Sequence, residues 1–85
     1  MDKFLLVSVF DREILLSLYN TIVEARNQMQ TEMILYGDIP KEMFELSSHE
    51  EDSFGFTEVS GWANSRYDCG WKIIPVADLE RGISI

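Results

Sequence analysis

Residues Asp11 to Gly37 read DREILLSLYNTIVEARNQMQTEMILYG, and whether this stretch forms helix or strand decides the fold. Asp11 is a suitable N-cap, Glu13 would lie in the first turn, and Gly37 suits the position after the last turn. Apolar residues recur at the intervals of three and four that are typical of one face of a helix: Leu15, Leu18, Ile22, Ala25, Met29, Met33 and Tyr36. The pattern predicts a single long helix.

This prediction has an alternative, because a helix of about 25 residues is long for so small a domain. In the alternative, the helix ends near Gln30, and Thr31–Tyr36 (TEMILY) forms a strand. We prefer the single helix, since its apolar stripe continues as far as Tyr36.

The segments on either side predict a small antiparallel sheet. KFLLVSVF at Lys3–Phe10 is short and apolar, as expected of a largely buried strand. FGFTEVSGWA at 54–63 and WKIIPV at 71–76 are predicted to be two strands of a hairpin, because NSRYDCG between them is rich in turn residues. Pro75 lacks an N–H, so the second of these strands is expected to lie at an edge or to stop there.

The remaining segments are shorter. Pro40–Leu46 predicts a short helix with Met43, Phe44 and Leu46 turned inward, Ser47–Ser53 a polar loop, and Ile83–Ile85 a few residues of extra pairing. The chain is therefore expected to be a single α+β domain, residues 1–85, with one long helix packed on a small, mostly antiparallel sheet of about three strands, plus a short helix.

Composition narrows the function. The net charge of −8 disfavours nucleic acid and anionic membrane as direct ligands, since both attract positively charged proteins. No apolar run approaches the roughly 20 residues that cross a bilayer, and the first residues lack the pattern of a signal peptide. Cys69 is the single cysteine, which excludes an intramolecular disulfide and favours the reducing cytoplasm.

The negative charge is concentrated between residues 38 and 58. This segment contains seven acidic residues and one basic residue, Lys41, so seven minus one places six of the eight net negative charges in about a quarter of the chain. The seven acids are Asp38, Glu42, Glu45, Glu50, Glu51, Asp52 and Glu58. Such a surface would speed the encounter with a basic partner.

The sequence gives little support for a metal site or a catalytic site. The run His49-Glu50-Glu51-Asp52 has neither the spacing of a calcium loop nor a second histidine for zinc. Cys69 and His49 are the one conceivable thiol–imidazole pair, but a neighbouring Asp68 would raise the pKa of the thiol. Because no glycine-rich phosphate loop is present either, we expect no catalytic residue, metal or cofactor.

Two further features suggest contact surfaces. Trp62, Tyr67 and Trp71 flank the expected hairpin, where they would pack across the strands, anchor a protein partner or line a small-ligand pocket. Between Ile14 and Thr31 only Glu24 and Arg26 are charged, and a charge-poor helix is compatible with burial against another chain.

The sequence thus predicts a small acidic, non-enzymatic inhibitor or regulator that docks on a basic, nucleic-acid-binding protein such as a nuclease. Phage inhibitors of host defence (anti-CRISPR or anti-restriction proteins) and nuclease immunity proteins share this general plan of size and charge, in which carboxylates imitate nucleic-acid phosphates. The alternatives are a structural or accessory subunit that self-associates through the charge-poor helix, for example as a homodimer, and a small-ligand binder that uses the Trp-rich hairpin. The predicted contact residues are Glu42, Glu45, Glu50, Glu51, Asp52, Trp62, Tyr67 and Trp71.

Overall fold

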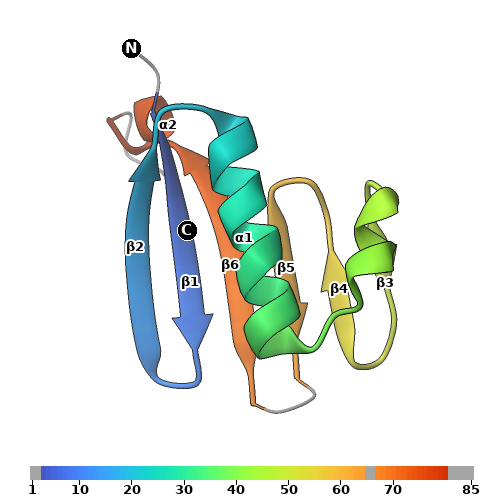
Figure 1. The fold of residues 1–85 in the computed structure, drawn as a ribbon. Coiled ribbons are helices and arrows are strands. Elements are labelled where there is room, and N and C mark those ends of the chain that lie inside the picture. Colours follow the sequence, from blue (N-terminus) through green and yellow to red (C-terminus); the bar gives the residue numbers. More distant parts are fainter. Residues whose placement is uncertain (1–2, 65–66, 81–85) are drawn as a thin grey trace.

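The computed structural model describes residues 3–64 and 67–80, in which one long helix and two short ones accompany an antiparallel sheet (Figure 1). The elements, in chain order, are β1 (Phe4–Phe10), β2 (Glu13–Tyr19), α1 (Ile22–Gly37), the 3-10 helix η1 (Lys41–Glu45), β3 (His49–Glu50), β4 (Phe54–Phe56), β5 (Ser60–Ala63), β6 (Cys69–Pro75) and the short helix α2 (Val76–Glu80).

The sheet has six strands in the order β2-β1-β6-β5-β4-β3, and every neighbouring pair is antiparallel. The hairpin β1–β2 forms one side, and the meander β3-β4-β5-β6 forms the other. The two halves join where β6 pairs with β1, from Phe4↔Pro75 to Phe10↔Cys69. Strands β2 and β3 are therefore the two edges of the sheet among the described residues.

The prediction of one long helix from residue 11 is wrong, and so is the alternative strand at 31–36. Glu13–Tyr19 is strand β2, and α1 begins only at Ile22. The turn Asp11-Arg12 joins β1 to β2, with Asp11 in the left-handed region at φ 56°. Thr21 is the N-cap of this helix: its Oγ accepts from the backbone N–H of Glu24 and donates to the Glu24 carboxylate.

Helix α1 packs on one face of the sheet, which we call the helix face. Its buried residues Ala25, Met29, Met33 and Gly37 follow each other at intervals of four. They belong to a core to which β1, β4, β5 and β6 also contribute: Leu6, Ala25, Met29, Met33, Ile39, Phe54, Phe56, Ala63, Cys69, Trp71 and Ile73. Helix α1 leaves the opposite side of the sheet uncovered, and we call that side the open face (Figure 1).

The expected sheet of about three strands is also wrong, because six strands form. The segment 54–63 is two strands, β4 and β5, joined by a turn in which the Thr57 N–H donates to the Ser60 carbonyl. The expected loop 47–53 contains the two residues of β3. Pro75 ends β6, but this strand lies in the centre of the sheet and not at an edge. Because Pro75 is the last residue of β6, its missing N–H interrupts no hydrogen bond inside the ladder.

The expected short helix at 40–46 exists as η1, with Met43 and Phe44 half-buried and Leu46 exposed instead of turned inward. The predicted strand at 3–10 is confirmed as β1. The pairing expected of Ile83–Ile85 lies outside the described residues. No helix of the described chain is long and apolar enough to cross a membrane.

Candidate functional site

The exposed carboxylates of the middle third gather around edge strand β3, at the end of the sheet farthest from β2 (Figure 1). We call this region the acidic end. Helix η1, strand β3 and the two turns that flank β4 present its six carboxylates: Glu42, Glu45, Glu50, Glu51, Asp52 and Glu58. Asp38, the seventh acid of this segment, is the left-handed C-cap of α1.

The acidic end surrounds the edge of the sheet and is not a flat face. Glu42 and Glu45 lie on η1, which covers the helix side of this region. Glu50 extends on the open face, where its Cγ and the Trp62 indole both lie close above Gly55. The carboxylates therefore point in several directions from one end of the molecule.

No described lysine or arginine forms an ion pair with these carboxylates. Among the described residues, Glu51 contacts the His49 ring, and neither Lys41 nor Arg26 forms an ion pair with a carboxylate of the acidic end. The Arg26 guanidinium instead donates to the backbone carbonyl of Glu58 at 3.0 Å. The sign of the local potential is thus set by the carboxylates.

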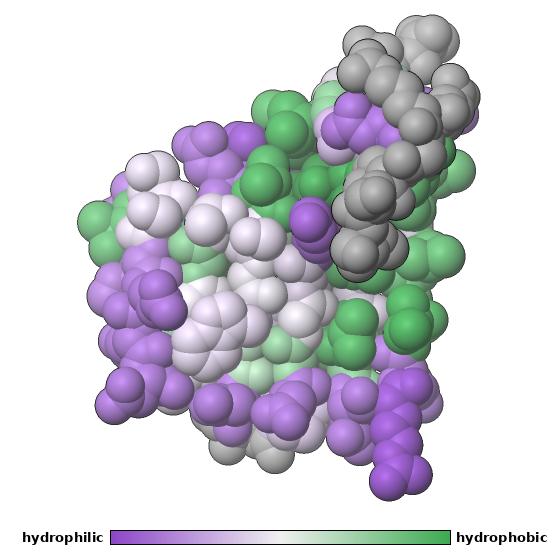
Figure 2. Space-filling model, turned by 180° about the vertical axis from the view of Figure 1, so that it is seen from behind, coloured by the Kyte–Doolittle hydropathy of each residue, from purple (hydrophilic) through white to green (hydrophobic). Residues whose placement is uncertain are grey.

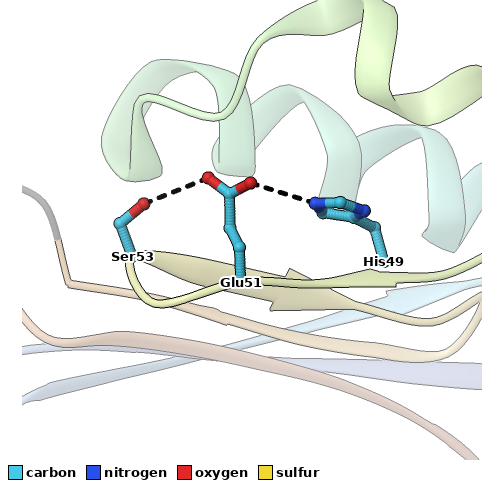
Figure 3. Close-up of polar contacts among 3 residues, drawn as sticks. All are labelled: His49, Glu51 and Ser53. Atoms are coloured by element: carbon cyan, nitrogen blue, oxygen red, sulfur yellow. Dashed lines mark hydrogen bonds and ion pairs between the residues drawn. The ribbon is translucent and has the colours of Figure 1, made fainter.

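Glu51 is the one member of the acidic end that side chains hold in place (Figure 3). Its Oε2 lies 3.0 Å from His49 Nε2, and its Oε1 accepts from the Ser53 hydroxyl at 3.3 Å. The His49 ring in turn packs against Phe54 and Phe56, with centroid distances of 5.6 and 6.3 Å. This local network orders the β3–β4 turn, in which Asp52 also lies.

A groove between α1 and η1 adjoins the acidic end. It has a volume of about 670 Å³, and its lining combines the apolar Ile34 and Phe44 with the charged Lys41, Glu42 and Glu45 of η1. Asn27, Gln30 and Thr31 of the charge-poor helix form the opposite wall. An apolar floor beside carboxylates is suited to a basic segment that also carries an apolar side chain.

The three predicted aromatic contact residues do not come together. The register Gly61↔Trp71 and Trp62↔Gly70 places the two tryptophans on opposite faces of the sheet. Trp71 lies in the core with 3% of its surface exposed, and Trp62 lies half-buried on the open face. Tyr67 is exposed in the connection between β5 and β6. Of the three, Trp62 is nearest to the acidic end, because Glu50 approaches the same glycine.

The residues considered for catalysis are far apart. Cys69 lies on β6 and His49 on β3, three strand spacings or about 14 Å apart, which is too far for proton transfer between them. Burial, with the Asp68 carboxylate as a second cause, raises the pKa of the Cys69 thiol. Among the described residues, no three histidine, cysteine or acidic side chains converge on a point.

The structure also reveals a surface that the sequence did not indicate. We call it the apolar strip: alternate residues of β1, β2 and β6 form it on the open face, namely Leu5, Val7, Val9, Ile14, Leu16, Leu18 and Ile74. Its β2 members are the most exposed, and the hydrophobic colour follows this side of the molecule while the acidic end is hydrophilic (Figure 2). Alternating apolar residues at 14, 16 and 18 were the available signal, but the neighbouring Leu15, Leu18 and Ile22 fit a helical stripe.

No protein-family model, curated protein or solved structure matches this chain, so the arrangement of its residues alone carries the functional argument.

Proposed function

We propose that this protein is a non-enzymatic binding protein, an inhibitor or regulator whose acidic end docks on the basic surface of a nucleic-acid-binding protein. The observation that carries this proposal is the gathering of six exposed carboxylates at one end of the sheet without a lysine or arginine ion pair among the described residues.

The charges are arranged to enter a concave basic site. They project around an edge rather than from a plane, so a groove that normally surrounds a nucleic acid can contact them from more than one side. Glu42 and Glu45 are three residues apart on a 3-10 helix, where such positions eclipse each other and lie about 6 Å apart along the axis. Closely spaced negative groups are also what lysine and arginine meet along a nucleic-acid backbone.

The groove between α1 and η1 would supply affinity that charge alone does not. Carboxylates at a rim mainly raise the association rate, and buried apolar anchors determine most of the dissociation rate. Ile34 and Phe44 at the floor of the groove offer such an anchor site next to Glu42 and Glu45. Binding should therefore weaken with salt without disappearing.

Charge reversal at the acidic end tests this proposal. Glu50→Lys, Glu51→Lys and Asp52→Lys together change the net charge by +6, from −8 to −2. The matched control reverses three exposed acids elsewhere, Glu13, Glu24 and Asp68, and also reaches −2. A general charge effect would alter both variants equally, whereas a localised docking surface predicts a loss in the first alone.

The two variants and the wild type would be immobilised and exposed to extract of the source cell at low and high salt. A partner that the wild type and the control retain, and the acidic-end variant loses, would then be purified. We expect its DNA or RNA binding, followed by fluorescence anisotropy, to be competed by the wild type and the control. The proposal fails if both triple variants behave like the wild type, or if the retained partner is not a basic protein.

A further inference from the structure

The edge strand β2 has an unpaired outer side. In the described part of the chain it pairs with β1 alone, along all seven residues and without a bulge. Every second residue of β2 therefore points its backbone N–H and C=O outward in the plane of the sheet, on the side opposite β1. Such an edge readily pairs with another strand.

Features that normally protect a sheet edge are present at β3 and absent from β2. Strand β3 is only two residues long and includes the charged Glu50. Strand β2 is long, has no lysine or proline, and carries its single charge at its first residue, Glu13. Its side chains Ile14 and Leu16 are 65% and 63% exposed. A long, apolar and unprotected edge is the form expected of a strand that has a partner.

The sequence of β2 is suited to pairing with its own copy. An antiparallel pair centred on Leu16 uses the whole strand and places Ile14 opposite Leu18 and Leu16 opposite itself on the open face. On the helix face the same register places Leu15 opposite Ser17 and Glu13 opposite Tyr19, so no like charges meet. The apolar strips of the two copies become continuous across the junction.

Electrostatics also permit a second copy at this edge. A net charge of −8 opposes self-association in general, but the acidic end lies at the other edge of the sheet. In a twelve-stranded sheet joined through β2, the two β3 strands are eleven spacings or about 50 Å apart. This is roughly six Debye lengths at physiological salt, so the acidic ends barely repel each other.

The area of the β2 edge limits the expected affinity of the association. Strand β2 has seven residues and is about 23 Å long, and the smallest extent of the molecule is 19 Å. Their product, about 440 Å², is the largest area that each copy can bury at this edge. Twice that area is below the roughly 1,200 Å² at which the range of stable complexes begins. We therefore expect an association that depends on concentration.

From these observations we propose that two copies of this chain associate through antiparallel β2–β2 pairing about Leu16, forming one continuous sheet with an acidic end at each extremity.

Two matched cysteine variants test the register. In the proposed dimer the two Leu16 residues face each other with Cα atoms about 5 Å apart, within the range of a disulfide, so Leu16→Cys should form a covalent dimer under mild oxidation. The two copies of Ile14 are four residues or about 13 Å apart along the strand, so Ile14→Cys should not. Both positions are equally exposed, and the native Cys69 is buried, so the wild type serves as the uncrosslinked reference.

Sedimentation from about 10 μM to 1 mM tests the association without a crosslink, across the range in which a small interface is populated. We expect a monomer–dimer equilibrium for the wild type and for Leu35→Lys, which changes an exposed residue of α1, and a monomer for Leu16→Lys. A wild type that stays monomeric over this range overturns the proposal. Equal crosslinking at 14 and 16, or dissociation by Leu35→Lys instead of Leu16→Lys, also overturns it.

Discussion

Glu32 connects the helix to the sheet, and its removal should be one of the most damaging single changes in this protein. Its Oε1 accepts from the Ser8 hydroxyl at 2.6 Å and from the Trp71 indole N–H at 3.2 Å, and its Oε2 accepts from the Gln28 amide at 2.9 Å. Ser8 and Trp71 are buried with 2% and 3% of their surfaces exposed. Glu32→Ala therefore leaves two donors in the core without an acceptor.

The cost follows from those two donors. An unsatisfied buried polar group costs about 1–3 kcal/mol, so the pair amounts to roughly 2–6 kcal/mol, and we take about 3 kcal/mol as the expected loss. A domain of this length is typically stable by about 4–13 kcal/mol. With a urea m-value of about 1.5 kcal/mol/M, the midpoint should fall by about 2 M.

Urea unfolding followed by tryptophan fluorescence measures this loss. Glu45→Ala, which removes an exposed glutamate of the acidic end, is the control and should change stability by less than about 0.5 kcal/mol. Ser8→Ala combined with Glu32→Ala should cost about 1–2 kcal/mol less than the sum of the two single changes, because Ser8 is one of the orphaned donors. A loss below about 1 kcal/mol for Glu32→Ala, or strict additivity, would refute the reasoning.

Three further changes probe other parts of the fold. Thr21→Ala removes the N-cap of α1 and should cost about 1 kcal/mol in the same urea assay, an expectation that an unchanged midpoint would contradict. Gly55→Ala would place a Cβ 2.6 Å from Trp62 Nε1, so we expect the indole to move, with a red-shifted emission spectrum and a loss of about 1–3 kcal/mol; an unaltered spectrum would count against this contact. Because the pKa of Cys69 is raised in the folded protein, the unfolded thiol ionises first: the stabilisation is complete below the ordinary thiol pKa of about 8.5 and is lost as the pH rises above it. The wild type should therefore lose more stability than Cys69→Ala between pH 7 and about pH 9.5, and equal losses would show that the thiol contributes nothing.

The sequence predicted the parts of this fold in which local pattern and tertiary structure agree. The apolar run of β1 and the buried stripe Ala25, Met29 and Met33 are such cases. Strand β2 was missed because Leu15 and Leu18 fit a helical interval of three, while the alternation of Ile14, Leu16 and Leu18 that is typical of a strand lies in the same apolar run. Pairing with β1 decided between the two patterns. The pattern Thr21-x-x-Glu24 was the local signal that the helix starts later.

Only the negative charge of the candidate site was predictable from the sequence, and not its arrangement in space. An excess of carboxylates in a polar segment must lie on the surface, but their collection around β3 depends on how η1 folds back beside the sheet. The faces occupied by Trp62 and Trp71 could not be inferred, since the pairing register of β5 with β6 sets them, and a shift by one residue would exchange the faces.

The central pairing of β1 with β6 has a consequence for biosynthesis. Residues 4–10 and 69–75 meet in the middle of the sheet, so the ladder cannot close until the ribosome has released almost the whole described chain. Before that moment the β1–β2 hairpin presents two open sides, one of which β6 must occupy. Nascent chains of this protein would thus depend on late insertion of the last strand, and a chaperone that shields the inner side of β1 would protect them from pairing wrongly.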